Sequence, residues 1–368
     1  MIAAWLYTSG GESRIPSYSY GMHIGSVNPA IPGSLVLGGY DKSRVLGEVS
    51  SQSIIRSSGT WQIGLKDIGL EVAAGGSPFG FTSKNGLFMQ GSGVVAPRSV
   101  VIDPTKPYMY LPEPTCDAIT AFFPVSFDST LGLYIWDTTR NNYANITSSA
   151  TYLSFLFKKD GLNDKTITIK IPLKLLTLTL QDPLVDQNLT YFPCFHSTDT
   201  PVLGRAFLQA AFVGVNWFEG NNAGTWFLGQ APGPGLPSAD ITAINVGDTT
   251  LAASSHSWNQ SWAKSWHPLA DSSPGNSTSS NGDLTTGGKA GIGIGVGVVG
   301  VIFIAAGAWI AILRRRRYRP SLGEQNIPCY QEVSELPPSN HMDGLPEELD
   351  ADHGRPQEMM GRQRHELE

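Results

Sequence analysis

The chain has 368 residues, of which 41% are hydrophobic and only 15% carry a formal charge. Its net charge of −6 gives no reason to expect a nucleic-acid partner. The three cysteines include no Cys-x-x-Cys pair, and the seven histidines show no His-Glu-x-x-His spacing. These patterns exclude the common zinc sites, and we expect neither a metal ion nor a cofactor.

Residues 1–236 have the pattern of a globular, mainly β domain. The abundant glycine (41) and proline (25) of the chain favour turns and strands over long helices. Short apolar and β-branched runs, some alternating with polar residues, predict strands. The best of these runs are residues 34–40, 61–65, 99–102, 166–171 and 225–228. Helical periodicity is scarce, and we predict short helices only at residues 114–123 and 204–212.

Residues 237–289 differ in composition, being rich in Ser, Thr, Gly and Asn. Such a segment predicts a flexible, glycosylated stalk that buries no core. Within it, Trp258, Trp262 and Trp266 are spaced by four residues. A helix would align them on one face, against a membrane surface or against the domain. We prefer the other interpretation, in which the Ser-Trp repeat arises by chance in a disordered stalk.

Residues 290–313 form an uncharged run of 24 residues. About 20 apolar residues cross a bilayer, so this run predicts one transmembrane helix. Four arginines at residues 314–317 follow it directly and place the C-terminus in the cytosol. Gly291 and Gly295 would allow two such helices to approach closely. A helix-mediated dimer is therefore one alternative, and a glycine-rich span without a dimer is the other.

The glycosylation sequons support the same topology. All of them precede the predicted span, at Asn145, Asn188, Asn259 and Asn276. This distribution predicts that the N-terminal part is extracellular or luminal, in the plasma membrane or the secretory pathway. Residues 314–368 are predicted to be a disordered cytosolic tail, because they are polar and rich in Pro and acidic residues. Residues 1–10 lack the features of a signal peptide, so we expect the N-terminal part to be incomplete.

Several segments of the β domain occur in a specific order. They are residues 15–21 (IPSYSYG), 33–41 (GSLVLGGYD), 61–63 (WQI), 100–103 (VVID) with 108–112 (YMYLP), and 202–208 (VLGRAFL). This order resembles the pepsin-like aspartic proteases, most closely the membrane-anchored fungal branch. The resemblance covers about residues 15–232. It implies a mainly β, bilobal acid-protease fold, of which this chain carries the C-terminal lobe and the strands between the lobes.

The resemblance also implies a chemistry and its residues. Each lobe of the family supplies one aspartate, and the two carboxylates, about 3 Å apart, share one proton and act on a water and a peptide as base and acid. The match makes Asp103 the aspartate of the C-terminal lobe. Val202, Leu203 and Gly204 would form the element that supports its loop. The implied function is that of a membrane-anchored aspartic endopeptidase homologue acting on peptides or proteins.

Two departures from the family pattern affect this interpretation. Pro104 and Thr105 stand where the family has Thr or Ser and then Gly, and Lys106 follows closely. Asp103 is therefore either the homologous catalytic position or an ordinary turn aspartate after a strand. The partner aspartate is also missing, since the sequence contains no Asp-Thr-Gly or Asp-Ser-Gly. We predict that this chain alone does not cleave peptides.

Family members carry a disulfide in this lobe, which implies a bridge between Cys116 and Cys194, the two cysteines before the span. Three functional hypotheses remain open. The first is a fragment of a membrane-anchored aspartic endopeptidase. The second is a non-catalytic cell-surface protein that uses the lobe for binding or signalling. The third is a cell-wall structural or sensor protein with the stalk as a spacer.

Overall fold

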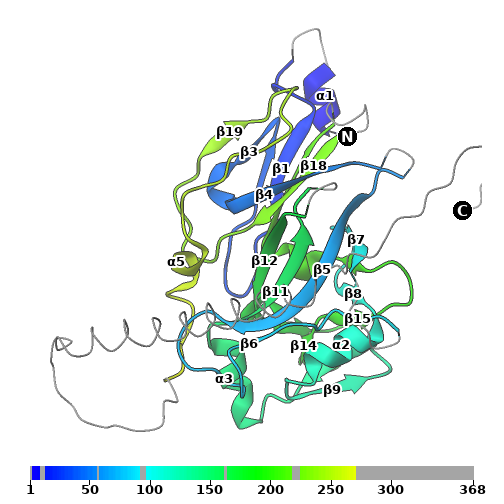
Figure 1. Ribbon diagram of the computed structural model, residues 1–368, viewed down its shortest axis with the longest axis vertical. Helices are drawn as coiled ribbons and strands as arrows, with labels where there is room; N and C mark the ends of the chain where they lie inside the picture. The colour runs from blue at the N-terminus through cyan, green and yellow to red at the C-terminus, as the bar shows by residue number, and fades with distance from the viewer. Residues whose placement is uncertain are drawn as a thin grey trace, which may run out of the picture. The chain divides into compact units, whose positions relative to one another are not determined.

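The computed structural model in Figure 1 describes residues 2–8, 13–55, 58–91, 97–160, 164–217 and 224–270. These residues are mainly β, as the sequence predicts. The predicted span at residues 290–313, the tail and Asn276 lie outside them. Among the helices of the described ranges, none has the length and apolarity needed to cross a membrane.

Five antiparallel strands form the sheet in the upper part of Figure 1, in the order β2-β1-β17-β18-β4. Their bounds are β1 Ser19–His23, β2 Ser34–Leu37, β4 Leu46–Ser53, β17 Ala211–Asn216 and β18 Thr225–Gln230. Every residue of β17 and β18 is buried, and most of the residues of each strand are apolar. Because β1 pairs with β17, the two ends of the β region meet in one sheet.

The largest sheet follows the order β12-β11-β5-β7-β16-β8-β15, with β6 paired to β5. Its strands are β5 Trp61–Val72, β6 Ser83–Lys84, β7 Arg98–Ile102, β8 Met109–Leu111, β11 Thr151–Lys158, β12 Thr166–Pro172, β15 Cys194–His196 and β16 Val202–Leu203. Two of the pairings, β16 with β7 and β15 with β8, are parallel. Parallel neighbours need long connections, so these pairs join residues far apart in the sequence.

Smaller elements flank the two large sheets. One small sheet has the order β13-β14-β10-β9 and another pairs β19 with β3. The strands are β3 Gly39–Asp41, β9 Val125–Asp128, β10 Leu133–Trp136, β13 Leu178–Leu180, β14 Leu189–Phe192 and β19 Ile241–Ala243. The helices are α1 Ile2–Thr8, η2 Lys42–Arg44, α2 Glu113–Thr120, α3 Asn141–Ser148, η3 Leu173–Leu176, α4 Arg205–Leu208 and α5 Trp258–Trp262.

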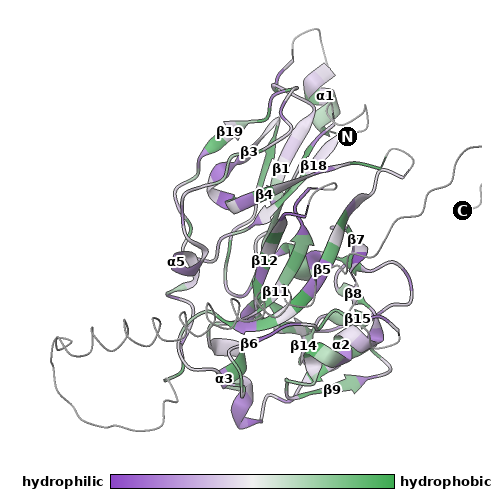
Figure 2. Ribbon diagram, viewed as in Figure 1, coloured by the Kyte–Doolittle hydropathy of each residue, from purple (hydrophilic) through white to green (hydrophobic). Residues whose placement is uncertain are grey.

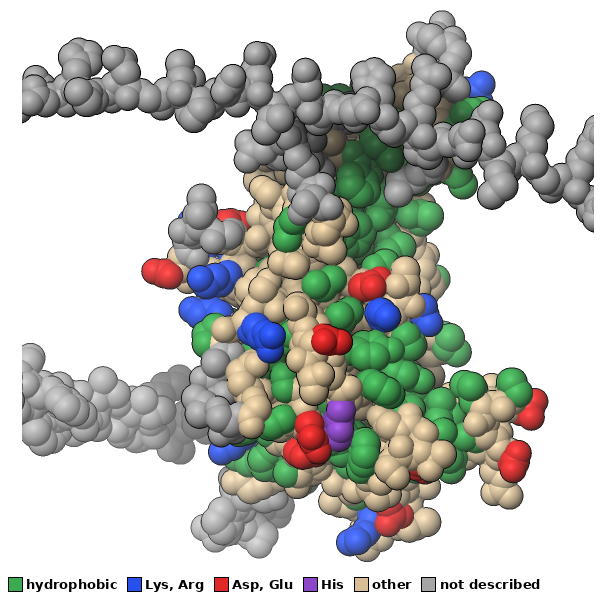
Figure 3. Space-filling model, turned by 90° about the vertical axis from the view of Figure 1, so that its right-hand side faces the viewer, with side chains coloured by type: hydrophobic (Ala, Val, Ile, Leu, Met, Phe, Trp, Pro, Cys, Tyr) green, Lys and Arg blue, Asp and Glu red, His purple; other side chains and the backbone are tan. Residues whose placement is uncertain are grey.

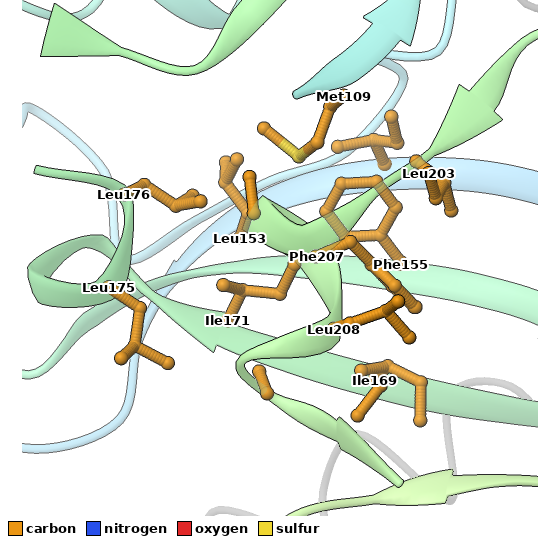
Figure 4. Packing of buried hydrophobic residues seen from close by; sticks show 14 of the residues in the cluster. Met109, Leu153, Phe155, Ile169, Ile171, Leu175, Leu176, Leu203, Phe207 and Leu208 are labelled. Atoms are coloured by element: carbon orange, nitrogen blue, oxygen red, sulfur yellow. The ribbon is translucent and has the colours of Figure 1, made fainter. Parts of the chain in front are cut away.

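One hydrophobic core joins the two large sheets. Figure 4 shows Phe207 of α4 between the side chains of β11 and β12, and its ring meets that of Phe155 edge-on with centroids 5.4 Å apart. Met109 and Leu203 are fully buried in the same cluster. Figure 2 shows the corresponding hydropathy pattern, in which β11 is hydrophobic and α3 is largely hydrophilic. The core therefore holds β16 and α4 against β11 and β12.

The five strand predictions are all confirmed, but three details of the predicted elements differ. The run at residues 34–40 is divided by Gly38, whose φ of +73° is the left-handed region that favours glycine. The helix predicted at residues 204–212 is too long, because it ends at Leu208 and the chain then enters the buried strand β17. Helix α3 was not predicted. Asn, Ser and Thr are weak helix formers, and Ile146 is its one buried residue.

The predicted stalk is wrong for residues 237–270. Strand β19 pairs with β3, and the side chains of Trp258, Trp262 and Trp266 are only 8%, 1% and 6% exposed. The aromatic surface of the three tryptophans outweighs the polar composition that suggested disorder, because each buried ring removes a large apolar area from water. The β-domain boundary expected at residue 236 is therefore too early, and residues 271–289 lie outside the described ranges.

The disulfide between Cys116 and Cys194 is present. Cys116 lies in α2 and Cys194 begins β15, with Cα atoms 5.8 Å apart and both side chains fully buried. The bridge ties the helix that follows β8 to the strand that pairs with β8.

Candidate functional site

The loop that contains Asp103 connects β7 to β8, and β16 lies between these two strands. Strand β16 pairs with β7 in parallel and with β8 antiparallel. The backbone N–H of Asp103 donates to the carbonyl of Leu203 at 3.2 Å, and that of Gly204 donates to Tyr108 at 3.0 Å. The structure thus brings together Asp103 and the segment Val202–Leu203–Gly204, which the sequence singled out from positions about a hundred residues apart.

Gly204 packs against the backbone of the Asp103 loop. A Cβ atom at this position would lie 2.3 Å from the carbonyl oxygen of Lys106 and 2.5 Å from that of Tyr108. The N–H of Arg205 also donates to the Lys106 carbonyl, at 2.8 Å. Because the contacts are backbone atoms, no side-chain rotation can relieve them, and glycine is required here for close approach.

We expect Gly204→Ala to lower the free energy of unfolding by about 3 kcal/mol, since the added methyl group must displace the loop carbonyls. Thermal or urea unfolding measures the effect. Gly80→Ala is the matched control, because a Cβ at Gly80 meets no atom within 4 Å. The control should change the stability by less than about 0.5 kcal/mol. Equal stability of both variants would contradict the close approach.

The Asp103 side chain is engaged within its own loop. Its Oδ1 accepts hydrogen bonds from the Thr105 N–H at 2.8 Å and the Thr105 hydroxyl at 2.7 Å. Among the described residues, no hydrogen bond to Oδ2 is found. Lys106 does not form an ion pair with Asp103; its Nζ lies 5.8 Å from the ring centre of Tyr110. Arg205 instead braces the loop, with Nη1 3.1 Å from the carbonyl oxygen of Thr105.

Two cavities flank the loop. The first cavity has a volume of about 700 Å³. Its lining includes two basic side chains, Arg98 and Lys106, two acidic side chains, Glu113 and Asp199, and Tyr110. The other, of about 540 Å³, lies where Pro107 and Arg205 meet the turn at residues 24–31. Figure 3 shows one face of the molecule, on which acidic, basic and hydrophobic side chains are interspersed without a patch of one sign.

His23 of β1 is buried beside the second cavity. Its Nε2–H donates to the carbonyl of Gln209 at 2.9 Å, and within the described structure its Nδ1 is buried without a partner. Burial lowers the pKa of His23 to about 4, although the Gln209 hydrogen bond opposes this shift, and the Arg44 charge lowers the pKa further. The imidazole is therefore neutral in the folded protein at neutral pH.

His23 makes the stability of the domain depend on pH. The pKa of an unfolded histidine is about 6.5, so the unfolded chain binds a proton before the folded one does. The contribution of neutral His23 to stability is fully present above about pH 6.5. As the pH falls toward 4, the free energy of unfolding decreases by about 3 kcal/mol. Urea unfolding between pH 7 and pH 4 measures this loss. His23→Gln should flatten the profile and His256→Gln, at an exposed position, should not; a profile unaffected by His23→Gln would contradict the assignment.

A polar chain that sequence reasoning missed lies near the first cavity. The Tyr134 hydroxyl donates to Asp117 Oδ1 at 2.5 Å and is 2.8 Å from Nε2 of His196, whose ring stacks on Phe127. Burial and the hydrogen bond to Asp117 raise the pKa of the Tyr134 hydroxyl. No spacing rule could have identified this set, because Tyr134 of β10 and His196 of β15 are 62 residues apart and belong to different sheets.

Other predicted site residues can be located as well. Asn145, Asn188 and Asn259 are exposed, so each is accessible on the folded domain. In the described ranges, no group of three or more His, Cys, Asp or Glu side chains is placed to hold a metal ion. No protein-family model matches the chain, and no curated protein matches it in sequence.

Proposed function

We propose that residues 15–232 are the C-terminal half of a pepsin-like aspartic endopeptidase and that Asp103 is one of its two catalytic carboxylates. The observation that carries the proposal is the position of β16 between β7 and β8. This arrangement supports the Asp103 loop with the Val202–Leu203–Gly204 segment, as the sequence resemblance implies. The flanking cavities give room for an extended peptide on both sides of the loop.

Peptide hydrolysis by this mechanism needs a second carboxylate next to Asp103, because one group must act as base while the other acts as acid. In the described structure, hydrogen bonds to the Asp103 side chain come from Thr105 alone. We therefore expect no cleavage by this chain by itself. A complete enzyme would form when a lobe carrying the second aspartate faces the Asp103 loop.

The test is a chimera that places the N-terminal half of a secreted pepsin-like protease before residue 15 of the full chain. The chimera should cleave a peptide library at mildly acidic pH, and the unmodified chain should not. Asp103→Asn should abolish the cleavage. Asp137→Asn is the matched control, because Asp137 makes the same two hydrogen bonds, with Thr139. A chimera that cleaves equally well with Asp103→Asn would overturn the proposal.

The resemblance between Asp103 and Asp137 favours a second candidate, a non-catalytic binding or signalling protein. Both carboxylates accept the N–H and hydroxyl of a threonine two residues later, and Asp137 is an exposed turn residue. Asp103 could then be a turn aspartate that fixes a ligand-binding loop. Tight binding of the inhibitor pepstatin by the chimera, lost in Asp103→Asn, would exclude this candidate.

We also propose that the domain is anchored through residues 290–313 and faces the lumen or the cell exterior, with residues 314–368 in the cytosol. The buried disulfide between Cys116 and Cys194 is typical of an oxidising compartment. Exposure of Asn145, Asn188 and Asn259 supports glycosylation at these three sequons. Removal of N-linked glycans from the native protein should reduce its mass in gel electrophoresis, and an unchanged mass would contradict this topology.

A further inference from the structure

The cavity of about 540 Å³ beside the Asp103 loop has a mostly apolar wall. Its lining includes Ile24, Val27, Ile31, Leu178 and Tyr191. Val27 projects from the turn at its edge, with 95% of its surface exposed. Small-molecule and peptide sites commonly combine an apolar wall with a few fixed polar groups. The polar groups of this cavity are therefore what would select the ligand.

Arg205 is the charged group of this lining. A guanidinium has five N–H donors in a planar fork. Nη1 is directed to the carbonyls of Thr105 and Pro104, at 3.1 and 3.4 Å, which holds the side chain in place. Among the described residues, no acceptor is found for Nε or Nη2, and no carboxylate lies within ion-pair distance of Arg205. The residue is exposed, so these remaining donors can meet a ligand.

The charge of this cavity is unbalanced. Its lining contains Arg205 and no Asp or Glu. The cavity on the other side of the loop contains two basic and two acidic side chains. The cavity also contains a second polar group that could bind a ligand. The hydroxyl oxygen of Ser26, in the same lining, is buried without a partner in the described structure. A braced guanidinium with a free edge is suited to a carboxylate, which accepts two parallel hydrogen bonds.

We propose that this cavity binds a carboxylate group of a peptide next to a bulky apolar residue, and that Arg205 determines this specificity. The proposal rests on the proposed function only in taking a peptide as the ligand. The carboxylate has two possible sources, the C-terminus of the peptide or the side chain of Asp or Glu. In both cases the apolar neighbour would contact Ile31 and Leu178 while the carboxylate meets the guanidinium.

The experiment measures the binding of dye-labelled hexapeptides to the full chain in detergent micelles at pH 7, by fluorescence anisotropy. Three peptides share an apolar centre and differ in charge: Gln with an amidated C-terminus, Glu with an amidated C-terminus, and Gln with a free C-terminus. At least one acidic peptide should bind about tenfold tighter than the neutral one, as expected for a charge-assisted pair. Which of the two does so identifies the source of the carboxylate.

Substitutions then assign the effect to Arg205. Arg205→Gln should remove the tenfold preference, Arg205→Lys should restore part of it, and Arg140→Gln, at an exposed position outside both cavities, should leave it unchanged. Arg205 also braces the Asp103 loop, so its substitution can disturb the fold of that loop. A second variant therefore leaves Arg205 in place. Val27→Asp, at a fully exposed position, should weaken the acidic peptide several-fold by charge repulsion, whereas Val27→Asn should not.

Equal binding of all three peptides would overturn the proposal, as would an equal loss of preference in Arg140→Gln. Binding is read without hydrolysis, so this result is independent of the cleavage test on Asp103. A preference for acidic peptides together with an inactive chimera would leave Arg205 as the recognition residue of a binding protein. An active chimera without the preference would retain the protease half and exclude the carboxylate site.

Discussion

Replacing both Cys116 and Cys194 with alanine should lower the free energy of unfolding by about 4 kcal/mol, close to the largest effect expected from any covalent change in this domain. The two residues are 78 positions apart, and a bridge over so long a loop greatly restricts the unfolded chain. Both side chains are fully buried, so the substitution also removes two sulfur atoms from the core and leaves a gap there. Urea unfolding at pH 7, followed by tryptophan fluorescence, measures the loss.

Cys329→Ala is the control for this prediction, because Cys329 lies in the predicted cytosolic tail. It should not shift the unfolding midpoint. A reducing agent added to the unsubstituted protein should reproduce the loss seen in the double variant. If the double variant unfolds at the same urea concentration as the parent chain, the bridge contributes nothing to stability and the prediction is wrong.

The positions of the strands could be predicted from the sequence, but the pairing of strands with one another could not. Period-two and apolar runs located five strands, since alternation is a local property. The insertion of β16 between β7 and β8 depends on a parallel pairing across about a hundred residues, and no local pattern encodes it. The order of the motifs supplied that connection through a family resemblance. The Asp117–Tyr134–His196 chain had no motif, and it could not be found in this way.

The side-chain contacts of the Asp103 loop could not be predicted from the sequence either. Lys106 stood close enough in the chain to suggest a contact with the carboxylate, but the backbone directs it toward Tyr110. No sequence pattern marks Arg205, which directly follows Gly204 in the segment VLGRAFL. Its role in bracing the Thr105 carbonyl follows from the hydrogen bonds between β16 and the loop. Side-chain direction near a functional loop is set by such tertiary pairings.

The proposed site and the stability of the domain have opposite pH requirements. A pair of carboxylates that shares one proton works under acidic conditions. Burial of neutral His23 stabilises the folded domain only when the pH stays above the range in which the unfolded histidine titrates. A complete enzyme built on this half would therefore combine activity and stability best in a mildly acidic compartment, and the cleavage test belongs at pH 5–6.

Trp262→Ala should lower the free energy of unfolding by about 4 kcal/mol, because a large buried ring is removed from the core and leaves a cavity. Trp262 is 1% exposed, stacks on Trp266 with centroids 6.0 Å apart, and lies flat against Gly233, where a Cβ would come within 2.6 Å of the ring. Trp5→Ala is the control, since Trp5 is 57% exposed and its loss should cost less than about 1 kcal/mol. Chemical unfolding compares the two variants. If residues 254–270 were instead a flexible stalk, both substitutions would leave the unfolding transition unchanged, and the three tryptophans would be the chance repeat that composition suggested.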